Sequence, residues 1–217
     1  MNQGILAPRT VFQDRYEILS LLRESRRAVV YEGRLLASGQ PIVLELLRLS
    51  RDEAPADPTR GRRARSLQRF LQEMRRCARL DHPCIVRPIE AGQAGDGLVF
   101  AVFAPVPGQS LAELLSARGA LEPPEARRLL RQVLDALGFA HRQGVVHGDL
   151  RPAQVLVTPP GALVLGFGFG ADAAAARAEQ EEAPLSGREI VGSQAYAAPE
   201  LHRGFSPTAR SDLYAWG

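Results

Sequence analysis

Hydrophobic and polar residues alternate in several short runs over roughly the first half of the chain. A period of two is typical of strands, and one stretch between Leu67 and Ala78 instead places apolar residues at helical spacing. The pattern predicts a small antiparallel sheet with one amphipathic helix, and a solvated polar loop at residues 51–65. The predicted strands are residues 16–23, 28–36, 41–49, 85–91 and 98–103.

The second half of the chain has mainly helical periodicity. A short helix is predicted at 111–117, and Pro123 and Pro124 open a longer helix with an apolar face from Ala126 to Ala140. Gly144 follows the end of that helix. Short strands are expected at 145–146, 155–157 and 163–165, and the poorly patterned segment 171–186 is expected to be mobile.

Charge and cysteine content exclude several classes of protein. The net charge of +3 combines 27 basic and 24 acidic residues, a balance too even for nucleic acid to be the main partner. No apolar run approaches the ~18–20 residues of a membrane span, and no signal peptide is visible. Cys77 and Cys84 lack a CxxC spacing and are expected to be reduced thiols. We therefore predict a cytoplasmic protein.

Several motifs occur in an order and spacing that resemble one family. HGDLRPAQVL at 147–156 resembles the HRDLKPxNIL catalytic loop of protein kinases, and GSQAYAAPE at 192–200 resembles their GTxxYxAPE motif. SDLYAWG at 211–217 resembles SDxYSxG, and RFLQE followed by LDHPCIV at 69–86 resembles the αC helix and the segment after it. Together these motifs resemble the bacterial, eukaryotic-like serine/threonine protein kinases.

The resemblance implies a two-lobe protein kinase-like fold of the α+β class. Its N-lobe would be a five-stranded antiparallel sheet with the αC helix, and its mainly helical C-lobe would be incomplete, because the family's central helix begins where this sequence stops. The implied organisation is an N-terminal leader at 1–15, an N-lobe at 16–104, a hinge at 105–108 and a partial C-lobe at 109–217.

The nucleotide-binding motifs depart from the family pattern. All 27 basic residues are arginine, so the third-strand lysine that holds ATP phosphates is absent, and Glu45 stands in its place. Arg23, Ser25 and Ala28 replace the loop glycines. The family partner of the lysine is Glu73, and two carboxylates about 4 Å apart repel by about 4 kcal/mol at an effective dielectric of about 20. We expect them to separate, share a proton or recruit an arginine.

Any nucleotide pocket is expected to be lined by Leu22, Val30, Val43, Ala104, Val106 and Leu156.

The metal-binding motif is also altered. DFG is replaced by Gly166-Phe167-Gly168, which removes the main Mg²⁺ ligand, and Gln154 stands where a second ligand is normally asparagine. We expect no metal site and no Mg²⁺, and the sequence leaves ATP binding open. The implied catalytic residues are Asp149, Arg151 and Gln154. Asp149 is either the base or an acceptor that shapes the loop, and we favour the second interpretation.

Three functional hypotheses follow. The first is a pseudokinase that binds or scaffolds a protein partner in signalling. The second is a divergent, active serine/threonine kinase in which Arg23, Arg26 or Arg27 supplies the missing phosphate-binding charge. The third is a truncated kinase fragment, in which the apolar face of the helix around Leu130 to Leu137 lacks part of its cover.

Overall fold

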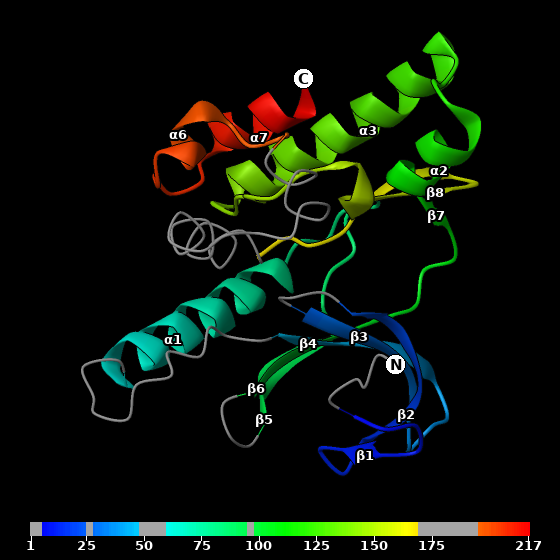
Figure 1. Cartoon of the computed structure of the whole chain (residues 1–217), viewed down its shortest axis with the longest axis vertical. Helices are drawn as coiled ribbons and strands as arrows, with labels where there is room; N and C mark the ends of the chain where they lie inside the picture. Colours follow the sequence, from blue (N-terminus) through cyan, green and yellow to red (C-terminus); the bar gives the residue numbers. More distant parts are fainter. Residues whose placement is uncertain (1–5, 25–27, 48–59, 95–97, 169–194) are drawn as a thin grey trace, which may run out of the picture. The chain divides into compact units, whose positions relative to one another are not determined.

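The computed structural model describes residues 6–24, 28–47, 60–94, 98–168 and 195–217. The chain divides into two compact units. The first contains Met1–Ala78 and Pro88–Val106, and the second contains Arg79–Arg87 and Pro107–Gly217. Figure 1 shows the first unit built on a curved sheet with one long helix, and the second on helices with a small sheet. The two units correspond broadly to a sheet-based part followed by a mainly helical part, as the residue pattern predicted.

The first unit contains a six-stranded antiparallel sheet in the order β1-β2-β3-β4-β6-β5. The sequence predicted five strands, and the additional strand β1 lies in the segment expected to be a leader. Phe12 in β1 is buried and packs edge-on against Phe100, with ring centroids 5.2 Å apart. The strands are β1 Val11–Phe12, β2 Tyr16–Glu24, β3 Ala28–Leu35, β4 Pro41–Leu47, β5 Glu90–Ala94 and β6 Leu98–Phe103.

The alternation of side chains along the strands separates the two faces of this sheet. Ile42, Leu44 and Leu46 of β4 join a buried cluster on one face, while Val43 and Glu45 are directed to the other face. Leu6 packs against the same cluster, and its N–H donates to the Tyr31 hydroxyl at 2.9 Å. The segment before residue 16 therefore helps to cover the core.

Two predicted boundaries in the first half of the chain are wrong. Helix α1 runs from Arg60 to Cys77, so it begins inside the predicted loop, although Phe70, Met74 and Cys77 are buried at the expected helical spacing. The strand predicted at 85–91 is found at 90–94 as β5. Ile85 instead closes a turn onto the His82 carbonyl and forms a parallel bridge with Val164. Apolar content alone could not show where α1 begins, or which part of residues 85–94 forms the strand.

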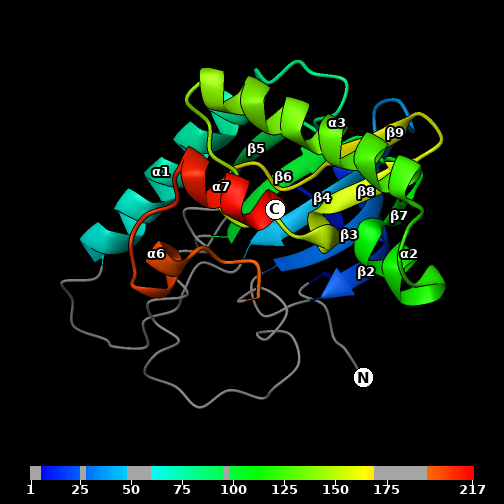
Figure 2. The same ribbon diagram turned by 90° about the horizontal axis from the view of Figure 1, so that it is seen from above.

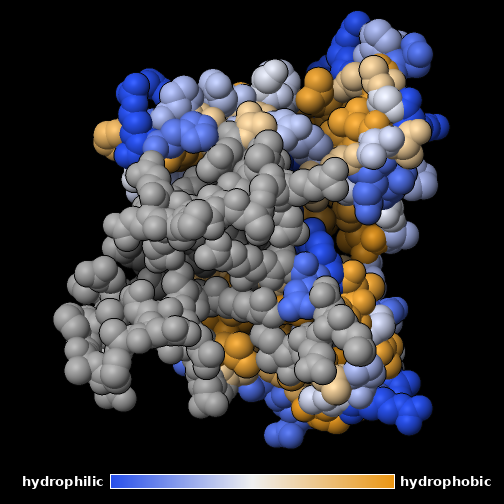
Figure 3. Space-filling view, in the orientation of Figure 1, coloured by the Kyte–Doolittle hydropathy of each residue, from blue (hydrophilic) through white to orange (hydrophobic). Residues whose placement is uncertain are grey.

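The second unit contains a three-stranded sheet, ordered β7-β8-β9, and several helices. Residues 145–146 form no strand, in contrast to the prediction, and 171–186 lie outside the described residues. Figure 3 shows hydrophobic surface around α2 next to hydrophilic surface on α3. Its elements are β7 Gln109–Ser110, α2 Leu111–Arg118, α3 Pro123–Arg142, the 3-10 helix η1 Pro152–Gln154, β8 Val155–Thr158, β9 Gly161–Val164, α6 Pro199–His202 and α7 Ala209–Trp216.

Helix α3 forms the centre of the second unit. Val133 and Leu137 are buried, and α7 lies beside α3 in both Figure 1 and Figure 2. The Trp216 indole N–H donates to the Leu130 carbonyl at 2.9 Å, and the Leu130 side chain remains 41% exposed. The expectation that this apolar face lacks part of its cover is therefore wrong for Val133 and Leu137. Among the described helices, none combines the length and apolar character that a membrane crossing requires.

Candidate functional site

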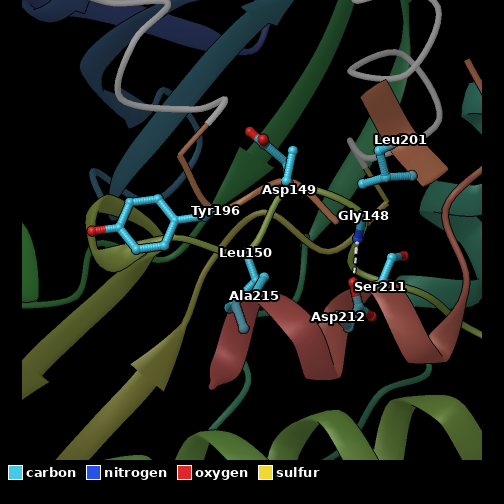
Figure 4. A pocket seen from close by; sticks show the side chains of 9 residues that line it. Gly148, Asp149, Leu150, Tyr196, Leu201, Ser211, Asp212 and Ala215 are labelled. Carbon is cyan, nitrogen blue, oxygen red and sulfur yellow. Dashed lines mark hydrogen bonds between the residues drawn. The ribbon is translucent and has the colours of Figure 1, made fainter. Parts of the chain in front are cut away.

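Asp212 of α7 anchors the loop that carries the candidate catalytic residues. Its Oδ1 accepts a hydrogen bond from the Gly148 N–H at 2.8 Å, and its Oδ2 accepts one from the His147 N–H at 2.8 Å. Figure 4 shows the bond to Gly148. Oδ2 also lies 2.8 Å from Nε2 of His141. A capping box between Thr208 and Ser211 caps helix α7, which begins at Ala209, and places the Asp212 carboxylate in its first turn. The Asp212 carboxylate therefore holds the loop backbone at two adjacent residues.

The contact with His141 is one that the sequence reasoning missed. His141 follows the buried Leu137 by four residues on α3, so the two side chains lie on one face of the helix. That spacing could have indicated that His141 lies on the buried face of α3. It could not identify Asp212 as the partner, because 71 residues separate the two in the sequence.

His147 connects the loop to the segment after β9. The ring is fully buried, and its Nδ1 accepts from the Asp149 N–H at 3.2 Å. Nε2 must then carry the proton of the neutral ring and donate to the Leu165 carbonyl at 2.7 Å. Burial lowers the pKa of His147, which agrees with this neutral form. The ring also packs edge-on against Phe167, at 4.9 Å between centroids.

Asp149 and Arg151 lie together in the same loop. Oδ2 of Asp149 is 3.5 Å from Nε of Arg151, and the two side chains are 12% and 31% exposed. The Arg151 Nε is buried and has no hydrogen-bond partner among the described residues. A proton acceptor therefore faces a fixed positive charge, an arrangement that can hold an anion or orient the loop.

A cavity of about 10 Å³ lies next to this loop. That volume is close to the minimum for one water molecule, so the cavity is too small for a nucleotide or a peptide side chain. Figure 4 shows the Asp149 carboxylate directed away from α7, while Asp212 is directed toward Gly148. The lining residues are Gly148, Asp149, Leu150, Tyr196, Ala197, Leu201, Ser211, Asp212 and Ala215.

The position of the usual metal ligand does not fit Mg²⁺. Gly166 has φ +80°, a backbone conformation that residues other than glycine rarely adopt. A Cβ added to Gly166 would lie 3.1 Å from Oε1 and 3.2 Å from Cδ of Gln154. The amide of Gln154 thus takes up the space in front of position 166. In the described part of the chain, no three His, Cys, Asp or Glu side chains are grouped to hold a metal ion.

Glu45 and Glu73 each interact with an arginine within the first unit. Glu73 pairs with Arg76 at 3.5 Å, one helical turn further along α1. Burial raises the pKa of Glu45, and the positive charge of Arg23 opposes this shift. Burial also raises the pKa of Glu73, opposed by Arg76. Of the expected outcomes, recruitment of an arginine agrees with these interactions.

The residues predicted to line a nucleotide pocket lie in both units. Leu22 is 54% exposed at an irregular point of β2, whereas Val30 is buried in β3 opposite Glu45. Val43 pairs with Phe103 in β6. The pocket itself stays a prediction, because Leu22, Val30, Val43, Ala104 and Val106 belong to the first unit and Leu156 to β8 of the second.

With this geometry established, comparison with known proteins gives the family. Residues 16–217 match the protein kinase domain family, and the chain belongs to that family. It is 34% identical over 212 residues to the serine/threonine-protein kinase pkn3 of Myxococcus xanthus, covering 94% of this chain and 36% of the relative. PrkC of Bacillus subtilis and PknB of Mycobacterium tuberculosis are each 29% identical and cover 94% of this chain.

These relatives are bacterial serine/threonine-protein kinases by name, which confirms the resemblance at the level of the family. The chain spans about a third of their length, covering 29% of PrkC and 31% of PknB. The fold expected from the motifs is confirmed as that of a protein kinase domain.

Proposed function

We propose that this kinase domain is a pseudokinase, with absent or very weak phosphotransfer, that acts by binding, scaffolding or regulating a protein partner. The observation that carries the proposal is the contact between Gln154 and the space in front of Gly166. Phosphoryl transfer in this family depends on metal ions that neutralise the phosphates. Here the main ligand is missing, and the amide of Gln154 lies 3.1 Å from the place of a Cβ at position 166.

The first unit supports the same proposal. Glu45 replaces the phosphate-binding lysine, and a carboxylate repels a triphosphate at close range. Glu73, which would pair with that lysine, is next to Arg76 instead. The remaining candidate, Asp149, has a structural explanation, since its carboxylate lies 3.5 Å from Nε of Arg151 in the same loop.

A second candidate function is a divergent, active serine/threonine kinase. The observation that favours it is the position of Arg23, whose charge acts on Glu45 and which is exposed to solvent. An arginine there could replace the charge of the missing lysine. In that function, Asp149 would serve as the base and Arg151 as the loop cation.

Phosphotransfer from labelled ATP to a generic protein substrate separates the two functions. We expect no transfer above that of the Asp149→Asn variant, with or without Mg²⁺. Transfer by the native chain that Asp149→Asn abolishes would overturn the pseudokinase proposal. ATP affinity measured by calorimetry in Mg²⁺ and in EDTA gives an independent readout. A tenfold gain in Mg²⁺, about 1.4 kcal/mol, would contradict the metal argument.

A further inference from the structure

Residues 6–12 form a strap over the core of the first unit and precede the part of the chain that matches the family. The Leu6 N–H donates to the Tyr31 hydroxyl at 2.9 Å, and the Leu6 side chain packs against the buried cluster. Phe12 is buried, and its ring lies edge-on to that of Phe100. The strap therefore adds both a hydrogen bond and apolar contacts to a sheet that the family match does not include it in.

The strap is also hydrogen-bonded along β2. The Arg9 N–H donates to the Ile18 carbonyl at 2.7 Å, and the Ile18 N–H donates to the Thr10 carbonyl at 2.9 Å. Strand β1, which ends the strap, lies beside β2 in Figure 1 and pairs with it. These partners all belong to the sheet of the first unit, so the groove under the strap is complementary to the strap sequence. A second copy of the chain carries the same groove.

The turn between the strap and β2 has an unfavourable backbone conformation. The Arg15 N–H donates to the Phe12 carbonyl at 3.2 Å, and the two central residues of this turn, Gln13 and Asp14, have φ +52° and +53°. Turns with positive φ at both central positions favour Asn-Gly. Residues with side chains are sterically disfavoured there, glutamine more than aspartate. A rearrangement that opens this turn therefore relieves strain.

The chain is anchored to the sheet directly after the turn. The Arg15 carbonyl accepts from the Leu36 N–H at 2.8 Å, and the Arg15 guanidinium pairs with Glu90 at 2.7 Å. The Tyr16 hydroxyl donates to the same carboxylate at 2.7 Å. These contacts hold the chain in place from residue 15 onward. Gln13 and Asp14 are therefore the hinge, and opening it moves the strap alone.

We propose that the strap exchanges between two copies of this chain, so that residues 6–12 of each copy fill the groove of the other in a two-fold symmetric dimer. Exchange keeps every contact of the strap, because the two grooves are identical. It also replaces the turn at Gln13 and Asp14 with an extended connection. Short hinge loops under strain favour such exchange, and a two-fold dimer satisfies both straps at once.

This inference goes beyond the proposed function, because it names a second copy of the chain as a partner and does not involve the site around Gly166. Phosphotransfer tests the pseudokinase proposal, whereas the oligomeric state tests exchange. Either proposal can therefore fail while the other stands.

Sedimentation of the full chain over a wide concentration range, after refolding from urea, measures the dimer dissociation constant. Combining Gln13→Asn with Asp14→Gly supplies the residues that the closed turn prefers, so we expect the dissociation constant to rise at least tenfold, about 1.4 kcal/mol. Gln13→Pro should lower it by a similar factor, because proline is restricted to φ near about −65° and excludes the closed turn.

Arg9→Gly is the matched control. Arg9 also has positive φ, at +68°, but it lies within the strap and not in the hinge. Its backbone conformation is the same whether the strap is closed on its own sheet or exchanged. The substitution relieves strain equally in both forms and should leave the dissociation constant unchanged.

Disulfide trapping distinguishes exchange from a dimer of any other kind. Val11 and Glu17 are direct partners across β1 and β2, so cysteines at both positions lie within bonding reach. Cys84→Ser removes the partly exposed native thiol. After oxidation, the isolated dimer should run as two linked chains on a denaturing gel, and the monomer should form the link within one chain.

The proposal is overturned if the native chain and Gln13→Pro are both monomeric at the highest concentration, or if the isolated dimer forms only links within single chains. It is also overturned if the Asn-Gly hinge dimerises as tightly as the native hinge. A monomeric Gln13→Pro in which the Ile18 N–H loses protection from hydrogen exchange would show that the strap detaches without exchanging, which likewise contradicts the proposal.

Discussion

The amide of Gln154 lies directly in front of Gly166, where a Cβ would be 3.1 Å from Oε1 and 3.4 Å from Nε2. The two residues stand where the motifs predict the two metal ligands of the family, and the amide of Gln154 packs against position 166. Restoring the aspartate alone would oppose both this packing and the backbone conformation.

Gly166→Asp should lower the free energy of unfolding by about 2–4 kcal/mol. Roughly 1 kcal/mol comes from the left-handed backbone and the rest from the contact with Gln154. Urea unfolding measures this change. Gly204→Asp is the control, because Gly204 has φ +78° with no atom within 4 Å of an added Cβ. Equal losses in the two variants would show that the contact with Gln154 contributes nothing.

Asp212→Ala should lower the free energy of unfolding by about 2–5 kcal/mol. It leaves the N–H groups of His147 and Gly148 without an acceptor, and a buried donor without a partner costs about 1–3 kcal/mol. Thermal or urea unfolding gives the value. Asp81→Ala is the control, since Asp81 is 86% exposed in a surface ion pair with Arg87, and its effect should stay within about 0.5 kcal/mol. A loss below about 1 kcal/mol in Asp212→Ala would contradict the anchoring role.

Glu45→Gln should stabilise the protein at neutral and alkaline pH more than near pH 4.5. The folded state raises the pKa of Glu45 above its ordinary value of 4.5, so the folded state binds more protons than the unfolded state in this window. Native stability then falls as pH rises from 4.5 through the raised pKa, and the glutamine variant lacks this loss. Urea unfolding across that range checks the slope. Glu32→Gln, an exposed carboxylate on the same face, should keep the native slope.

Phe12→Ala should lower the free energy of unfolding by about 3–5 kcal/mol, as for other buried phenylalanines. Phe12 is 7% exposed and packs on Phe100, although it precedes the residues that match the family. The adjacent Val11, at 48% exposed, is the control, and Val11→Ala should cost less than about 1 kcal/mol. Equal effects would mean that β1 does not belong to the core.

Most elements of this fold could be predicted from the pattern of apolar residues. Strands β2, β3, β4 and β6 and helix α3 lie close to their predicted ranges, because each has a sustained period of two or 3.6. The features that the pattern did not predict are either very short or depend on pairing with residues far away in the sequence. The two-residue strand β1 is defined by its pairing with β2, and Ile85 pairs with Val164, which is distant in the sequence.

The sequence by itself determined which chemical groups are present. It established that lysine is absent, and its motif order predicts that Glu45 and Gly166 stand at the family's lysine and aspartate positions and that Asp149 and Asp212 are retained. These predictions need no coordinates.

Only the tertiary structure decided how those groups act on one another. It joined His141 to Asp212 across 71 residues, set Gln154 against Gly166, and paired both Arg23 and Glu45 with Val30. β2 carries two register shifts, and each moves the residues that follow by one position relative to β3, so the partner of Arg23 depends on both. These shifts depend on the pairing of β2 with β3, which no local pattern in the sequence encodes.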